Sequence, residues 1–108
     1  MNKKIVTERT GSFHDLLLDS LKNAKKASAY LQVALDEYQE DGDVEAFLMA
    51  LRNVAEAQGG LGMLAKKTHL NRQHLYSALS SKGNPRLDTL GVLLKGLGFH
   101  LSIEPVHA

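Results

Sequence analysis

The chain has 108 residues, of which 44% are hydrophobic and 23% are charged, and this composition is that of an ordinary globular protein. The length predicts one compact domain with a single core. The absence of cysteine excludes disulfides and thiolate metal sites, and no apolar run is long enough for a membrane span. The polar first residues do not resemble a signal peptide, so we expect a cytoplasmic protein.

The net charge of +1 hides an uneven distribution of charged residues along the chain. Between Ala57 and Leu87 every charged residue is basic, namely Lys66, Lys67, Arg72, Lys82 and Arg86. A separate run is entirely acidic and contains Asp36, Glu37, Glu40, Asp41, Asp43 and Glu45. The two runs indicate two surfaces with different partners, although ordinary solvated faces would also have such compositions.

The first half of the chain predicts helices behind a flexible tail at residues 1–11, which have no hydrophobic period. Ser12 is the expected N-cap of a first helix, with Asp15 three residues later. Its apolar face contains Phe13, Leu16, Leu17 and Leu21. A second helix restarts at Asn23 and ends near Gly42, and its apolar stripe contains Ala27, Tyr30, Leu31, Ala34 and Tyr38.

A third helix is predicted between Asp43, its expected N-cap, and the Gly59-Gly60 pair, which supplies the positive φ of a C-cap. Its apolar positions are Val44, Phe47, Leu48, Leu51, Val54 and Ala55. Two short helices follow, separated by a turn that ends at Asn71, the expected N-cap of the second. Their apolar positions are Leu61, Leu64 and Ala65, and then Leu75, Ala78 and Leu79.

The turn Gly83-Asn84-Pro85 leads to a last helix, closed by Gly98, whose apolar positions are Leu87, Leu90, Leu93, Leu94 and Leu97. After it, Phe99, Leu101 and Ile103 alternate with polar residues, which predicts a short C-terminal β-strand. No second strand is visible in the sequence. We therefore expect this strand to pair with its copy in another subunit and form a homodimer.

The two short helices have the pattern of a helix-turn-helix, in which helices pack steeply across a short turn. Ala65 is small enough for a close approach, and Leu70 places an apolar side chain at the turn. The second helix would bury its apolar stripe and expose Arg72, Gln73, Tyr76 and Ser77. Arg and Gln form bidentate hydrogen bonds with guanine and adenine, so these four are the candidate base-reading residues. Any short helical hairpin would also need small and apolar residues here.

The candidate phosphate contacts surround this helix and are Lys66, Lys67, Asn71, His74, Lys82 and Arg86. No catalytic site is predicted, because the sequence contains no nucleophile motif, P-loop or dinucleotide fingerprint. The histidines lack the spacing of a metal site. We expect no metal, no cofactor and no enzymatic activity.

From about Phe13 to Glu104 the chain resembles the addiction-module antidote proteins, antitoxins with a lambda-repressor-like helix-turn-helix that are related to the HigA type. The resemblance rests on residues 29–31, 42–55, 57–60, 75–79, 83–90 and 97–98, of which Gly83-Asn84-Pro85 with Asp88-Thr89-Leu90 is the most specific part. It departs from the pattern at His69, where a turn glycine is usual, so this residue is expected to be left-handed or the turn to differ. It also departs at Leu61, where many such domains have Gln.

The resemblance implies a cognate toxin of the RelE/ParE superfamily, its neutralisation, and repression of the operon through double-stranded operator DNA. The expected fold is all-α, a lambda-repressor-like helix-turn-helix bundle with N-terminal helices and a short C-terminal strand. Residues 12–58 form the candidate toxin-binding part and residues 59–108 the DNA-binding region. The acidic run would face a basic toxin.

Other readings of the sequence remain open. The acidic run is equally compatible with a solvated loop. The tail, with Lys3, Lys4, Ile5 and Val6, is disordered, orders on a toxin, or reaches DNA as a basic arm. The protein is alternatively an orphan phage-type regulator without a toxin, or a toxin inhibitor that no longer binds DNA.

Overall fold

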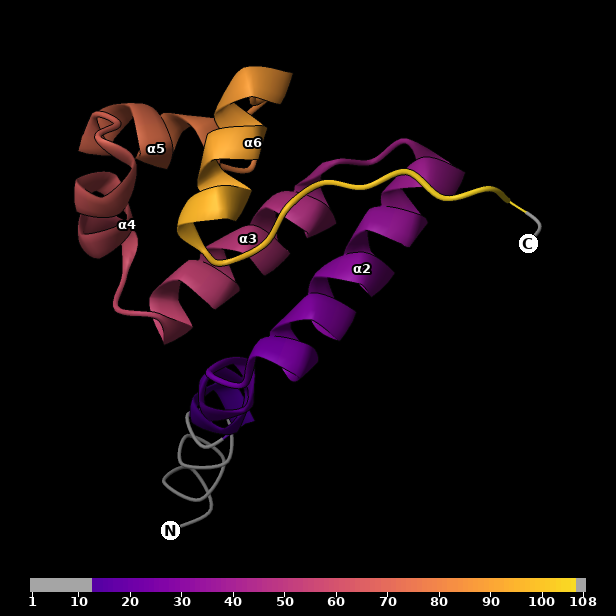
Figure 1. Ribbon diagram of the computed structural model, residues 1–108, viewed down its shortest axis with the longest axis horizontal. Coiled ribbons are helices and arrows are strands. Elements are labelled where there is room, and N and C mark those ends of the chain that lie inside the picture. Colours follow the sequence, from indigo (N-terminus) through magenta and orange to yellow (C-terminus); the bar gives the residue numbers. More distant parts are fainter. Residues whose placement is uncertain (1–12, 107–108) are drawn as a thin grey trace, which may run out of the picture.

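The computed structural model describes residues 13–106, and this part of the chain is all-helical, as predicted (Figure 1). A helical segment at residues 13–21 is followed by α2 (Ala24–Asp41), α3 (Glu45–Ala57), α4 (Leu61–Thr68), α5 (Arg72–Ala78) and α6 (Leu87–Gly96). The expectations for the tail and for Ser12 as an N-cap lie outside the described residues. None of the described helices is long and apolar enough to cross a membrane.

The helices begin and end close to the residues that the cap chemistry predicts. The side chain of Asn23 accepts a hydrogen bond from the N–H of Lys26 at 3.0 Å, and Gly42 ends α2 in the left-handed region at φ 74°. The prediction of Asp43 as N-cap is wrong by one residue, because α3 begins at Glu45 and Val44 occupies the cap position. The Asp43 carboxylate nevertheless accepts the N–H of Glu45 at 3.0 Å, so it still serves an orphan donor of that helix.

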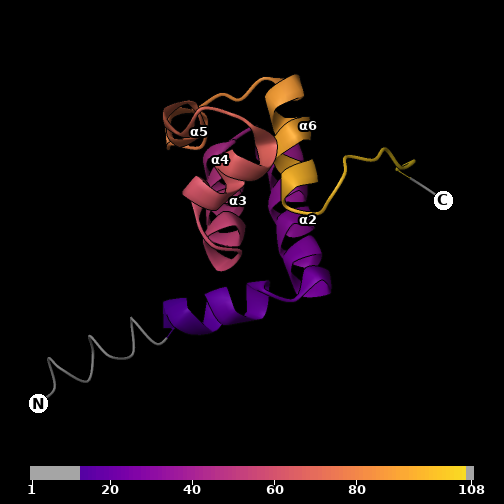
Figure 2. The ribbon, with the colours of Figure 1, turned by 60° about the vertical axis from the view of Figure 1, so that its left-hand side comes forward.

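A single buried cluster joins the helical segment at residues 13–21 to all the helices that follow, which confirms the predicted single core. Its most deeply buried large side chains are Leu48, Leu51, Leu75, Leu79, Leu93 and Val54. In Figure 1, α3 lies between α2 and the group formed by α4, α5 and α6. The segment at residues 13–21 lies across the lower end of α2 (Figure 2). Leu87, predicted on an apolar face, is 73% exposed because it is the first residue of α6.

The predicted C-terminal β-strand is absent from the described chain, because residues 99–105 form no strand within a single copy. The N–H of Phe99 bonds to the carbonyl of Leu94 at 2.7 Å and closes the end of α6. The segment then runs along the molecule toward the C-terminal end of α2 (Figure 1). A strand requires a neighbour for its backbone groups, and residues 13–106 contain no second strand to supply one.

The packing of α6 on α4 depends on a glycine. A Cβ atom added at Gly96 would lie 2.7 Å from Cγ2 of Thr68 and 2.9 Å from Cδ1 of Leu64. Leu64 is buried and the β-branched Thr68 is stiff, so neither side chain can move away easily. The missing side chain therefore sets how closely the two helices approach.

Two glycine substitutions in α6 test this close contact. Gly96→Ala should lower the free energy of unfolding by about 1–3 kcal/mol, because the overpacking exceeds the gain in helix propensity. Gly91→Ala is the matched control, because nothing lies within 4 Å of a Cβ atom there, and it should raise stability by about 0.5–1 kcal/mol. Urea unfolding followed by circular dichroism measures both. Equal effects of the two substitutions would contradict the assigned role of Gly96.

Candidate nucleic-acid interface

Residues 69–71 connect α4 to α5 through a tight turn that is stabilised from both sides. His69 has φ 60° and ψ 20°, which is the left-handed conformation, one of the two alternatives expected at this position. The hydroxyl of Thr68 donates to the carbonyl of Leu64 at 2.8 Å and accepts the N–H of Leu70 at 3.3 Å. The side chain of Asn71 accepts the N–H of His74 at 3.1 Å, which confirms it as the N-cap of α5.

Helix α5 divides cleanly into a buried face and an exposed face. Leu75 and Ala78 are buried against the core, as predicted from the apolar stripe. The predicted base-reading residues all lie on the exposed face: Arg72, Gln73, Tyr76 and Ser77. The helix therefore brings together a guanidinium, an amide and two hydroxyl groups on one outward surface beside the turn.

Two of these side chains form a stacked pair on the surface. Cζ of Arg72 lies 5.6 Å from the ring centroid of Tyr76, and Nη2 of Arg72 donates to the Tyr76 hydroxyl at 3.3 Å. A Cβ atom added at Gly62 would lie 3.7 Å from Cζ of Arg72, so the guanidinium also covers the first turn of α4. Arg72 thus lies beside the position where Leu61 replaces the usual Gln. The pair keeps the guanidinium near α5 and limits its rotamers.

Half of the six predicted phosphate contacts line one hollow between α5 and α6, of about 330 Å³. Its lining includes His74, Ser77, Lys82 and Arg86. Arg86 also pairs with Asp88 at 3.4 Å, an exposed ion pair that a stronger anion can replace at little cost. The other three candidates lie outside this hollow: Lys66 and Lys67 are exposed in the last turn of α4, and Asn71 is the N-cap of α5.

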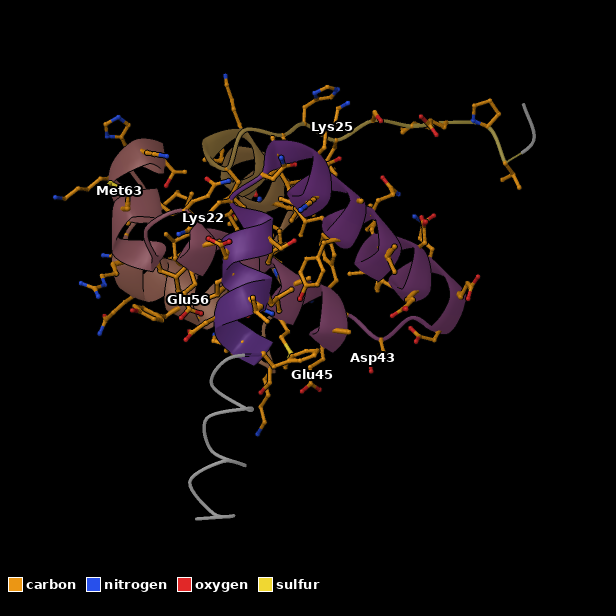
Figure 3. The ribbon with its side chains drawn as sticks, turned by 90° about the horizontal axis from the view of Figure 1, so that it is seen from below. Lys22, Lys25, Asp43, Glu45, Glu56 and Met63 are labelled. Carbon is orange, nitrogen blue, oxygen red and sulfur yellow. The ribbon has the colours of Figure 1, made fainter. Side chains whose placement is uncertain are left out.

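The acidic run lies at another end of the molecule from α4 and α5. Asp36, Glu37, Glu40 and Asp41 are exposed on the last turns of α2, and Asp43 and Glu45 follow beside them. Figure 3 shows Asp43 and Glu45 on the side of the molecule away from Met63 of α4. In Figure 1, the loop between α2 and α3 likewise lies at the opposite end of the long axis from α5. The structure therefore separates the acidic surface from the basic one.

Sequence reasoning missed three side chains of α3 that donate hydrogen bonds to other helices. Nη1 of Arg52 donates to the carbonyl of Leu79 at the end of α5. Nδ2 of Asn53 donates to the Tyr30 hydroxyl in α2 at 2.9 Å, and Nε2 of Gln58 donates to the carbonyl of Leu97 at the end of α6 at 2.9 Å. These polar residues border the apolar stripe of α3, but nothing in the pattern indicates their distant acceptors.

The exposed face of α5 and the hollow beside it offer hydrogen-bonding groups and positive charge. Among residues 13–106, no three His, Asp or Glu side chains come together in a way that would hold a metal ion. The face of α5 offers hydrogen-bond donors to an anionic partner, and the hollow beside it contributes two cations and an imidazole. Such a surface suits recognition of the edges and phosphates of a nucleic acid.

Comparison with known proteins supports a specific family. A protein of Haemophilus influenzae, described as uncharacterized, is 30% identical over 74 residues, which are 68% of this chain and 75% of that protein. No solved structure matches the chain significantly. The family described as "Probable addiction module antidote protein" matches residues 13–105. Because this match covers nearly the whole chain, the protein belongs to that family of addiction module antidote proteins.

Proposed function

We propose that this protein is the antitoxin of a type II toxin–antitoxin module, which neutralises a RelE/ParE-superfamily toxin and represses its own operon by binding operator DNA. Membership of the antidote family supports the toxin partner. The observation that supports the DNA-binding part of the proposal is the exposed polar face of α5, which directly follows the turn at residues 69–71. In this proposal α4 and α5 are a lambda-repressor-like helix-turn-helix.

The exposed side chains of α5 match what a reading helix needs in the major groove. Arg72 and Gln73 lie in its first turn, where a recognition helix contacts base edges. The guanidinium pairs with guanine and the amide with adenine, in each case through two hydrogen bonds. Tyr76 and Ser77, one turn later, reach base edges or phosphates. The cationic hollow beside α5 then holds the DNA backbone and sets the register.

The acidic end of α2 is the proposed contact for the toxin. The ribosome-associated toxins of this superfamily are typically basic because their target is RNA, so an acidic surface attracts them and speeds association. The exposed carboxylates between Asp36 and Glu45 are the part of the chain that offers this charge. Since this surface and α5 lie at opposite ends of the molecule, the toxin and the operator can be bound at once. Residues 12–58 and 59–108 are then the two functional parts of one fold.

We propose further that two copies associate through residues 99–103. Leu101 is 40% exposed and Ile103 is fully exposed, an arrangement that leaves apolar surface in water. Within the described chain, no hydrogen bond is found to the backbone groups of residues 100–105. Pairing with the same segment of a second copy would satisfy these groups and cover both side chains. A two-fold dimer also suits a palindromic operator.

Substitution of the first turn of α5 tests the reading residues. Arg72→Ala and Gln73→Ala should each reduce discrimination between the upstream operator and an unrelated duplex by about 1–3 kcal/mol, because each removes a bidentate contact. Fluorescence anisotropy over a salt series measures this, and the wild type should lose affinity steeply as salt rises. Lys25→Ala, which removes an exposed cation from the far end of α2, is the control and should leave binding unchanged. Absence of DNA binding at low salt would instead favour a pure toxin inhibitor.

Charge reversal on α2 tests the toxin contact. Asp36, Asp41 and Asp43 each accept a hydrogen bond that supports the local fold, so Glu37 and Glu40 are the residues to change. The double Lys variant should associate with the toxin of the neighbouring gene roughly 10-fold or more slowly at low salt, because attraction becomes repulsion.

Surface plasmon resonance and growth rescue on co-expression measure the toxin contact. Glu56→Lys, the same kind of change near the C-terminal end of α3, should leave the association rate within about twofold, since its exposed carboxylate contacts only the exposed His14 and steering acts locally at ordinary salt. A normal association rate of the double variant would rule out the acidic surface as the contact. If no neighbouring gene encodes a toxin, the orphan-regulator alternative gains support.

Light scattering at micromolar concentration tests the dimer. The wild type should have the mass of a dimer, and Ile103→Lys should shift it to a monomer, because a charge on the paired edge disfavours strand pairing. Val33→Lys, at a residue of α2 that is 58% exposed, is the control and should remain dimeric. A monomeric wild type would contradict pairing through residues 99–103.

A further inference from the structure

Helix α5 is too short to be stable by itself, and another helix completes its C-terminal end. It has seven residues, and a helix of that length is unstable in isolation. Its last turn contains no basic residue that could compensate the negative end of the helix dipole. The half-buried Arg52 of α3 donates a hydrogen bond to the carbonyl of Leu79, the C-cap residue of α5. A guanidinium from 27 residues earlier in the chain therefore caps this helix.

The other contacts at this end show why the direction of α5 depends on that bond. Leu75 and Leu79 are buried and fix the depth of the helix against the core. The loop returns so closely that a Cβ atom at Gly83 would lie 2.1 Å from the carbonyl oxygen of Ala78. Apolar packing has no preferred direction, whereas the hydrogen bond from α3 has one, so it adds a constraint on the rotation of α5 about its buried stripe.

We propose that Arg52 is a positioning residue for DNA reading, which holds the end of α5 on α3 and so sets the angle at which Arg72 and Gln73 meet the bases. This inference rests on the proposed DNA binding. Arg52 itself does not contact DNA, because its guanidinium is directed to the end of α5 and is half-buried. Bidentate base contacts tolerate displacements of only about 0.5 Å, so a small rotation of α5 weakens them.

The C-cap residue of α3 provides a natural control. The side chain of this residue, Gln58, donates to the carbonyl of Leu97, the C-cap residue of α6. Loss of either donor removes one side-chain hydrogen bond to a helix C-terminus. Only Arg52 serves the helix that carries the proposed reading residues. Gln58→Met and Arg52→Met therefore separate a loss of general stability from a loss of α5 position.

Hydrogen exchange of the free protein provides the first arm of the experiment. Arg52→Met should raise the exchange rate of the Leu79 amide, which bonds to Leu75 at 3.0 Å, by roughly tenfold relative to wild type. Gln58→Met should raise it by no more than about twofold, since α5 keeps its cap. Arg52→Lys, which retains a cationic donor but lacks the planar fork, should lie between the two. Equal exchange in both Met variants would overturn the proposal.

DNA binding provides the second arm, with the operator and an unrelated duplex of equal length. Arg52→Met should weaken operator binding by roughly tenfold, about the loss of one base contact, and leave binding of the unrelated duplex within about twofold. Arg52→Lys should recover part of the loss, and Gln58→Met should keep the wild-type ratio. Parallel losses on both duplexes, with a salt slope shallower by about one, would overturn the proposal and make Arg52 a phosphate contact.

The two arms distinguish failure of this inference from failure of the proposed function. A wild type that does not discriminate the operator from unrelated DNA contradicts sequence-specific binding, and with it the role of Arg52 in reading. A wild type that discriminates, together with an Arg52→Met variant that discriminates equally well, leaves the proposed function intact and overturns the positioning role alone.

Discussion

The positions of the other helices depend on α3, which buries one face in the core and donates side-chain hydrogen bonds to its neighbours. Its buried residues are Phe47, Leu48, Ala50, Leu51, Val54 and Ala55. Their burial packs α2 on one side of α3 and the later helices on the other (Figure 1). Hydrophobic contact alone is not directional, and the three donors at the borders of this stripe add direction. Each bonds to a different helix, so α3 determines both the packing and the orientation of its neighbours.

Much of this fold follows from local patterns in the sequence. The apolar period of α3 predicts its buried face, and short-range chemistry predicts Asn71 as a cap and the restart of a helix at Asn23. At His69 the family resemblance left two alternatives, a left-handed residue or a different turn, and the structure has the left-handed residue. The C-terminal strand does not form within a single copy, because alternation is a property of one segment, whereas a strand requires a second one. Residues 99–105 have the pattern but no partner within the described chain.

In the candidate site, too, features set by nearby residues could be predicted, whereas contacts between distant parts of the chain could not. The exposed face of α5 could be predicted because exposure on a helix follows from its period. The contact of Arg72 with Tyr76 is one helical turn long, so the spacing permits it without requiring it. The bond from Arg52 to α5 was not predictable, because its acceptor is a backbone carbonyl, which every residue has. Pairings of this kind appear only when the helices are placed in space.

The two faces of α5 have different roles: the buried residues fix the position of the helix, and the exposed residues are available for recognition. Its folded position depends on Leu75 and Ala78, on the cap at Asn71 and on Arg52. The outward side chains contribute little to that position, so they are free to be exchanged. Related proteins with this fold can therefore change their recognition residues while the buried residues that pack α5 stay the same. Duplicated copies in one genome can become insulated from one another through a few surface substitutions.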